Sequence, residues 1–120
     1  MNIHGQMSIA KTFRLSNADI RSIRLAREII LQDIQNPPTL PALATLAGVN
    51  EFKLKYGFRM VFSNSVYRYL TEHRLEVAKQ DVLEGYKSMT EIAYDTGYTS
   101  LSHFSNAFKK KFGVSPVKMR

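Results

Sequence analysis

Apolar residues recur at helical spacing along most of this chain, and no stretch alternates apolar and polar residues over more than four positions. This pattern favours helices and gives no support to strands. The first apolar face comprises Ile20, Ile23, Ile30 and Ile34. Ser16 and Asp19 form a capping box in front of it, whereas Pro37-Pro38 cannot continue a helix. We therefore predict a first helix that begins after Ser16 and stops near Asn36.

Two later stretches share one layout. In each, a short apolar run leads to a glycine, then to a residue of the type that caps helices, and then to a longer amphipathic segment that ends on phenylalanine. The first stretch covers 43–62, and the second covers 92–112, about fifty residues further on. Gly48 and Gly97 supply the turns, because glycine adopts backbone conformations that other residues resist. The layout predicts a helix-turn-helix unit that occurs twice.

The remaining segments connect and extend these units. Residues 66–84 predict one long helix, closed by Gly85, which at 1.5 Å per residue would be about 28 Å long. Ser88 and Glu91 form a second capping box, and Ser115-Pro116 opens a short last turn. Helix caps are expected at Thr39, Asn50, Ser65, Ser88, Ser115 and either Thr99 or Ser100.

The expected fold is therefore all-α, with seven helices in two helix-turn-helix lobes joined by a long linker helix. We assign 1–15 to a tail or linker and 16–65 to the first lobe. The linker helix takes 66–85, and the second lobe takes 86–120.

The 120 residues include 17 Lys and Arg against 10 Asp and Glu, which gives a net charge of +7 and a pI near 9.8. From 97 to 120 there is no acidic residue, and the basic ones are Lys109, Lys110, Lys111, Lys118 and Arg120. A positive excess favours a polyanionic partner, although composition does not separate DNA from RNA or a membrane surface. Cations near a helix end also simply suit the helix dipole.

Several functional classes find no support in the sequence. Cysteine is absent, which excludes disulfides and thiolate metal sites and fits a reducing cytoplasm. No apolar run approaches the roughly 18–20 residues of a membrane span. His4, His73 and His103 are scattered, without a nucleophile beside a base or a phosphate-binding loop. We expect no enzymatic activity, no cofactor, no metal and no membrane partner, and we expect a cytoplasmic protein at the nucleoid.

In a helix-turn-helix unit, the exposed N-terminal half of the second helix enters the major groove. In segment 51–62, the residues outside the expected core, and therefore expected to be exposed, are Glu51, Phe52, Lys53, Lys55, Tyr56 and Arg59. In segment 101–112, the corresponding residues are Ser102, His103, Ser105, Asn106, Lys109 and Lys110. Asparagine matches adenine through a bidentate contact, and lysine matches guanine. Asn106 is therefore our leading base-reading candidate.

Each candidate also has a plainer interpretation. Asn106 is otherwise a solvated position, and His103 a capping or core histidine. Phe52 and Tyr56 either contact thymine methyl groups or cover the core. Phosphates are bound by cations, hydroxyl groups and helix N-termini. The phosphate-binding candidates by that criterion are Arg59, Ser88, Thr90, Ser105, Lys109 and Lys110.

The separation of the two units carries a prediction of its own. Half-sites on one face of DNA lie about 34–36 Å apart. A rigid helix of about 28 Å, together with the widths of two lobes, would hold two recognition helices at that distance. We therefore expect one chain to read two adjacent major grooves of double-stranded DNA without dimerising.

Glu91–Tyr98 and Ser102–Pro116 resemble, almost position for position, the C-terminal signature of the AraC/XylS family of bacterial transcription regulators. The resemblance covers 22–120, and the siderophore-responsive, pyochelin-regulator type is the most similar sub-group. It implies two lobes with seven helices, sequence-specific DNA binding for transcription regulation, and base readers at Phe52, Lys53, Lys55, Tyr56, Ser102, His103 and Asn106.

This chain departs from the family pattern at three positions. Relatives often carry arginine where it has Tyr56 and Asn106, and usually glycine where it has Ser63. The two missing arginines imply a different base preference. Family members usually join this module to an effector-binding or dimerising domain, and no such domain is expected within this chain, which would be an excised module or a stand-alone member. For a transcription regulator we also expect RNA polymerase as a partner.

Two other functions compete with specific DNA binding. A helical protein-interaction module is one, although two repeats are fewer than the three that a solenoid normally needs. A non-specific nucleic-acid binder or an RNA binder is the other, although a stacking sheet and a Gly-x-x-Gly clamp are both missing.

Overall fold

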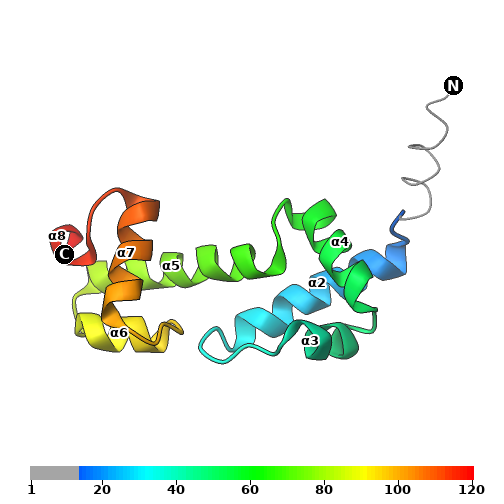
Figure 1. The fold of residues 1–120 in the computed structure, drawn as a ribbon, viewed down its shortest axis with the longest axis horizontal. Coiled ribbons are helices and arrows are strands. Elements are labelled where there is room, and N and C mark those ends of the chain that lie inside the picture. The colour runs from blue at the N-terminus through cyan, green and yellow to red at the C-terminus, as the bar shows by residue number, and fades with distance from the viewer. Residues whose placement is uncertain (1–13) are drawn as a thin grey trace, which may run out of the picture. The chain divides into compact units, whose positions relative to one another are not determined.

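The computed structural model describes residues 14–120, and the regular structure in that range is entirely helical. Its seven helices carry the labels of Figure 1 and are α2 (Asn17–Gln32), α3 (Leu40–Ala47), α4 (Glu51–Phe62), α5 (Val66–Glu84), α6 (Met89–Asp95), α7 (Leu101–Phe112) and α8 (Pro116–Met119). The expected all-α class is confirmed, and residues 14–120 contain the seven helices that were expected there. The tail or linker expected at 1–15 falls outside the described residues, apart from Arg14 and Leu15.

By their contacts, the residues form two units. Among the described residues, unit 1 comprises 14–29 and Pro38–Val66, and so contains most of α2 with all of α3 and α4. Unit 2 comprises Ile30–Pro37 and Tyr67–Arg120, and so contains α6, α7, α8 and nearly all of α5. The segment Ile30–Pro37 therefore packs with unit 2, although it precedes α3 in the sequence.

Side chains cap most of the helix starts. In the box before α2, the backbone N–H of Ser16 donates to Asp19 and the N–H of Asp19 donates to Ser16 Oγ, both at 3.0 Å. The expected caps are confirmed at Thr39, Asn50, Ser88, Ser100 and Ser115. Of the two residues proposed to cap α7, it is Ser100 that does so. The cap expected at Ser65 stays a prediction.

Helix α2 ends at Gln32 rather than near Asn36, so this boundary prediction was wrong by one turn. The carboxylate of Asp33 accepts the backbone N–H of Asn36 at 3.0 Å, and such a local bond competes with the helical one. Ile34 was expected on the apolar face of the helix. It lies instead beyond the helix end, where its carbonyl accepts the Nε–H of Arg74 at 2.8 Å.

The core of unit 1 forms where α2, α3 and α4 meet. Its buried apolar side chains are Ile23, Ala26, Leu43, Ala44, Ala47, Leu54 and Phe58. Gly57 of α4 faces α2 so closely that a Cβ atom there would lie 2.7 Å from side-chain atoms of Ile23. The glycine therefore permits α4 to pack closely against α2.

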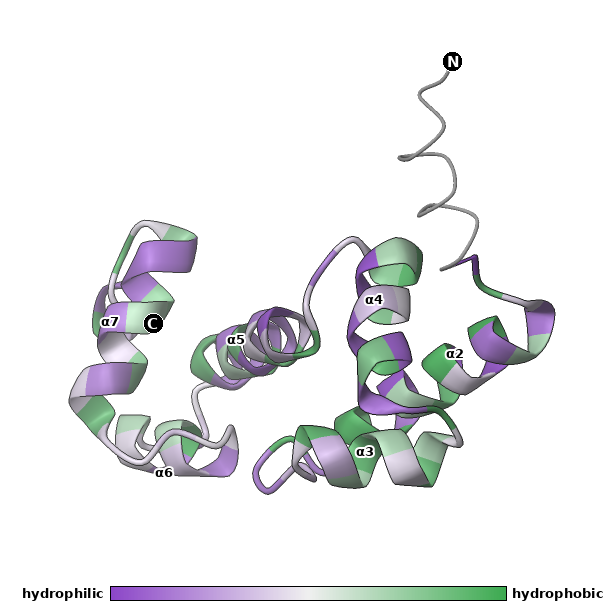
Figure 2. Ribbon diagram, turned by 45° about the vertical axis from the view of Figure 1, so that its right-hand side comes forward, coloured by the Kyte–Doolittle hydropathy of each residue, from purple (hydrophilic) through white to green (hydrophobic). Residues whose placement is uncertain are grey.

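The core of unit 2 comprises Leu75, Ala78, Val82, Ile92, Ala93, Tyr98, Phe104 and Phe108. These residues come from α5, α6, the following turn and α7, and Met89, Ala107, Phe112 and Met119 pack against them. Because phenylalanines at 104 and 108 are one helical turn apart, one face of α7 is buried and the opposite face stays polar. Figure 2 shows hydrophobic and hydrophilic residues interleaved along both α4 and α7.

Ser63 ends α4 with φ of 61°, and among residues 14–120 it is the one non-glycine residue with positive φ. Left-handed backbone costs a residue with a Cβ atom about 1–2 kcal/mol. We expect Ser63→Gly to stabilise unit 1 by about 0.5–1 kcal/mol, since the greater chain entropy of unfolded glycine offsets part of that gain. Thermal unfolding followed by circular dichroism measures it. Ser63→Ala keeps the Cβ atom and should give no increase in melting temperature; an equal gain from alanine would contradict the backbone explanation.

Candidate nucleic-acid interface

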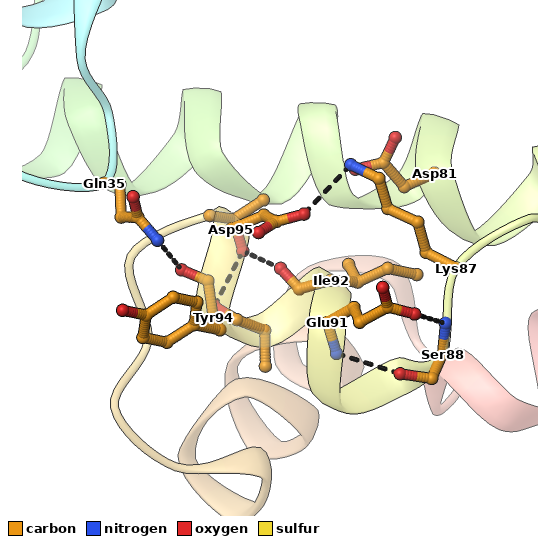
Figure 3. Close-up of polar contacts among 10 residues, drawn as sticks. Gln35, Asp81, Lys87, Ser88, Glu91, Ile92, Tyr94 and Asp95 are labelled. Atoms are coloured by element: carbon orange, nitrogen blue, oxygen red, sulfur yellow. Dashed lines mark hydrogen bonds and ion pairs between the residues drawn. The ribbon is translucent and has the colours of Figure 1, made fainter.

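Helix α6, the first helix of the second helix-turn-helix unit, is fixed at both ends (Figure 3). At its start, the N–H of Ser88 donates to Glu91 Oε1 at 2.9 Å and the N–H of Glu91 donates to Ser88 Oγ at 3.1 Å. At its end, Gln35 Nε2 donates to the carbonyl of Tyr94 at 3.0 Å. The buried hydroxyl of Thr96 donates to the carbonyl of Ile92 at 2.7 Å.

Lys87 adds an ionic connection between α5 and α6. Its Nζ lies 3.0 Å from a carboxylate oxygen of Asp95 and 3.6 Å from one of Asp81 (Figure 3). The hydrogen bond to Asp95, and then the charge of Asp81, raise the pKa of Lys87 above its ordinary value. Lys87 and the contacts at both helix ends therefore hold α6 in place beside the turn and α7.

The turn between α6 and α7 requires glycine. Gly97 has φ of 95°, and a Cβ atom there would lie 2.5 Å from Nη2 of Arg74. Ser100 then accepts the backbone N–H of His103 at 3.0 Å, which fixes the first turn of α7. The start of the predicted recognition helix is thus determined by a local cap and by a tertiary contact.

The side of α7 away from the core carries the residues predicted to contact DNA. Ser102, His103, Asn106, Lys109 and Lys110 are exposed, and Ser105 is half-buried. His103 is therefore not a core histidine; its ring packs edge-on against Tyr98, with centroids 5.4 Å apart. Within residues 14–120, the side chains of Asn106, Lys109 and Lys110 have no hydrogen-bond or ion-pair partner. These side chains are available to a ligand.

Lys111 differs from the two lysines before it. Its ammonium bonds to the carboxylate of Glu72 on α5 and lies 3.6 Å from that of Glu76, and its side chain is 21% exposed. The hydrogen bond to Glu72 is the main cause that raises the pKa of Lys111. This cation fastens α7 to α5 within unit 2, and is thereby distinguished from Lys109 and Lys110.

On α4, the predicted base-reading residues form a different surface. Phe52 is 56% exposed, and its ring is parallel to that of Tyr56, with centroids 6.3 Å apart. Lys55 pairs with Glu51 at 3.0 Å. Arg59, the phosphate candidate of this helix, is exposed. The exposed side of α4 therefore combines the ring of Phe52 with the cations Lys55 and Arg59, whereas that of α7 is polar.

Lys53 was expected to point into solvent, but the structure gives it a partner. Its Nζ lies 3.3 Å from Asp19 at the start of α2, and its side chain is 41% exposed. The backbone N–H of Ser16, and then Lys53, hold the pKa of Asp19 below its ordinary value. Reading a base with Lys53 would require this surface ion pair to open, which costs little, since exposed pairs contribute about 0–1 kcal/mol.

Ser88 and Thr90 were predicted to bind phosphate at the start of α6. Both are exposed, but the N–H and the hydroxyl of Ser88 are already used in the capping box. The same box places the carboxylate of Glu91 at this helix end, where it repels an anion. These two residues are consequently weaker phosphate candidates than Lys109 and Lys110.

Sequence reasoning did not single out Arg74. It appeared as one charged residue on a mostly apolar face of the long helix, and a charge in that position was the available signal. The structure shows that its guanidinium contacts both the loop after α2 and the turn before α7.

The described residues show neither a membrane-spanning element nor a metal cluster. None of α2 to α8 is long and apolar enough to cross a bilayer. Between 14 and 120 there is also no group of three or more His, Asp or Glu side chains that could hold a metal ion.

Comparison with known proteins places this arrangement in context. The sequence profile of a family described as "Helix-turn-helix domain" matches residues 43–120. The chain is 42% identical to the regulatory protein PchR of Pseudomonas aeruginosa over 65 residues, which are 54% of this chain and 22% of that protein. It is 38% identical to the HTH-type transcriptional regulator GlxA of Rhizobium meliloti over 87 residues, or 72% of this chain and 27% of that one. The chain thus spans about a quarter of the length of these relatives.

A solved structure shares the fold. It is a transcriptional regulator of Chromobacterium violaceum, described as an AraC-type DNA-binding domain-containing protein, and it superposes with a TM-score of 0.77 at 25% identity. The match covers 82% of this chain and 88% of the other. The matched family profile describes a helix-turn-helix domain and not a catalytic one.

Proposed function

Since the chain belongs to the family of AraC-type helix-turn-helix domains, we propose that it binds double-stranded DNA in a sequence-specific manner and regulates transcription. The observation that carries this proposal is the exposed side of α7. There Ser102, His103 and Asn106 present donors and acceptors next to the unpaired cations Lys109 and Lys110. Base edges in the major groove are read by such amide and hydroxyl groups, and phosphates are held by such cations.

Each unit contributes one recognition helix, α7 in unit 2 and α4 in unit 1. On α4 the exposed Phe52 and its neighbour Tyr56 suit the methyl groups of thymine better than they suit polar base edges. On α7 the amide of Asn106 suits adenine. We therefore propose an asymmetric site, in which one half is selected mainly by apolar contact and the other by hydrogen bonds.

The linker helix supports reading of adjacent grooves by one chain. Helix α5 has 19 residues and is therefore about 28 Å long. Half-sites one turn of DNA apart are separated by about 34–36 Å. We propose that unit 1 and unit 2 bind successive major grooves, so that one polypeptide recognises a bipartite sequence without dimerising.

Selection from a random duplex library of about 30 base pairs, roughly three helical turns, tests these statements at about 0.15 M salt. We expect two short motifs with centres about ten base pairs apart, and a monomer on DNA by analytical ultracentrifugation. Enrichment of one motif alone would mean that a single unit reads bases. Absence of any enrichment, with weak binding to every duplex, would favour a non-specific nucleic-acid binder and reject the proposal.

Transcription regulation adds two finer proposals. The protein would act at the nucleoid in the cytoplasm, and it would influence RNA polymerase at promoters that contain its site. Transcription in vitro from a template carrying the selected sequence, with and without the protein, tests the second. An unchanged transcript level at saturating protein would argue against an effect on polymerase.

Lys110→Ala should weaken binding to all duplexes by a similar factor and reduce the slope of log K against log salt by about one, because one phosphate contact is lost. Fluorescence anisotropy on two unrelated duplexes at several salt concentrations measures both quantities. Lys111→Ala is the matched control, since its ammonium is held by Glu72 and Glu76. That control should lower thermal stability and leave the salt slope nearly unchanged. A loss confined to one duplex sequence would assign Lys110 to base reading instead.

A further inference from the structure

Unit 2 contains a hollow of about 190 Å³ between α5 and the turn that leads into α7. Tyr67, Thr71 and Arg74 line it from α5, Tyr98 and Thr99 from the turn, and His103 from α7. Its volume is several times the roughly 30 Å³ that one water molecule occupies in the liquid. The hollow is therefore large enough for a phosphate group, and it adjoins a residue predicted to read bases.

The charge of the lining is positive. Arg74 is its one permanently charged residue, and the lining contains no Asp or Glu. Arg74 has no carboxylate partner in the part of the chain that the structure describes. Burial raises the pKa of the Tyr98 hydroxyl; the charge of Arg74 acts against that rise, and the charge of Glu72 adds to it.

The guanidinium is held in place from one side. Arg74 Nε donates to the carbonyl of Ile34 at 2.8 Å, which leaves the N–H groups of its two terminal nitrogens to other acceptors. Gly97 lies against the same group, because a Cβ atom at this position would come within 2.5 Å of Nη2. A cation anchored through Nε and backed by a glycine loses little conformational entropy when it binds an anion.

We propose that this hollow binds a phosphate group through Arg74 and the hydroxyl group of Thr99, while Thr71 lines the hollow beside them. A guanidinium fork matches two phosphate oxygens, and hydroxyl groups donate to the others. The group has two possible sources, the DNA backbone beside α7 and free phosphate. The first source rests on the proposed function, and the second does not.

The test places a carboxylate inside the hollow and leaves Arg74 intact, because loss of Arg74 would also break its bond to Ile34. Thr71→Glu puts a negative charge among the lining groups, whereas Thr71→Gln has nearly the same size without the charge. Gln80→Glu adds the same charge at an exposed position of α5 outside the hollow. Circular dichroism melts confirm that all three variants are folded.

The first arm measures binding to random-sequence duplex DNA at several salt concentrations. We expect Thr71→Glu to bind about tenfold more weakly than Thr71→Gln, with a salt slope smaller by about one. Gln80→Glu should lose far less than Thr71→Glu. If Thr71→Glu and Thr71→Gln have equal affinities and slopes, the DNA backbone is excluded as the source of the phosphate.

The second arm titrates inorganic phosphate into the ¹⁵N-labelled protein without DNA. We expect saturable shifts at the Gly97 amide and at Arg74 Nε–H in the wild type and in Thr71→Gln, and none in Thr71→Glu. Saturation here without a DNA effect assigns the site to free phosphate. If the protein binds inorganic phosphate saturably but binds no DNA duplex, the proposed DNA-binding function is rejected and the phosphate site is confirmed. If neither arm separates Thr71→Glu from Thr71→Gln, the site does not exist.

Discussion

Replacing Gly97 with valine is expected to lower the melting temperature by roughly 10–30 °C, which corresponds to about 2–4 kcal/mol for a small domain. Its φ of 95° lies in a region that a β-branched residue adopts only under strain, at a cost of about 1–3 kcal/mol. The new Cβ atom would also displace the guanidinium of Arg74 and weaken its bond to Ile34, worth about 1 kcal/mol. Thermal unfolding followed by circular dichroism measures the sum.

Gly113→Val separates these two causes. Gly113 also lies in unit 2 and has φ of 84°, but a Cβ atom there would meet nothing within 4 Å. Its replacement therefore carries the backbone strain without the collision. We expect Gly113→Val to cost less than Gly97→Val by about the energy of one hydrogen bond, near 1 kcal/mol. Equal losses of stability in the two variants would show that the guanidinium of Arg74 moves aside at no cost. An unchanged melting temperature for Gly97→Val would refute the role of this turn.

Asn106→Ala is expected to lower affinity for the selected DNA site about 5- to 150-fold, the equivalent of about 1–3 kcal/mol, and to relax preference at one base pair. The exposed carboxamide has the geometry for adenine N6 and N7, and alanine removes both bonds. Competition assays with the preferred duplex and its three single-base-pair variants at each position measure the effect. A uniform loss on every sequence would place Asn106 outside base reading.

Asn106→Arg sharpens this test because it changes the preference without removing the contact. Arginine pairs with guanine O6 and N7. At the position where the wild type selects adenine, the variant should select guanine. Lys109→Ala is the comparison variant for a phosphate contact at the neighbouring exposed side of α7, and it should weaken all duplexes alike. A variant Asn106→Arg that keeps the adenine preference would contradict our assignment.

The sequence predicted the helices well because their determinants are local. Periodic apolar residues and cap residues act within about one helical turn, so residues 66–84 were placed at the observed bounds of α5. The caps at Thr39, Asn50 and Ser88 were predicted for the same reason. The end of α2 was missed because two local signals compete there, the proline pair and the side chain of Asp33.

The exposed side of α7 was also predictable, because removing the core positions of an amphipathic helix leaves its polar face. Ser102, His103 and Asn106 are exposed as that reasoning requires. The identity of the free cations was not fully predictable. The sequence presents Lys109, Lys110 and Lys111 as one basic run, and a partner on another helix removes the third from it.

By itself, the sequence determined the all-α class, the two helix-turn-helix units and the polar surface that we propose to bind DNA. The tertiary structure alone decided which charged groups are engaged. Lys111 meets Glu72 across 39 positions, Arg74 meets Ile34 across 40, and Gln35 meets Tyr94 across 59. Helix periodicity and capping depend on neighbours a few residues away, whereas an ion pair or a long-range hydrogen bond depends on which distant segments the folded core brings together.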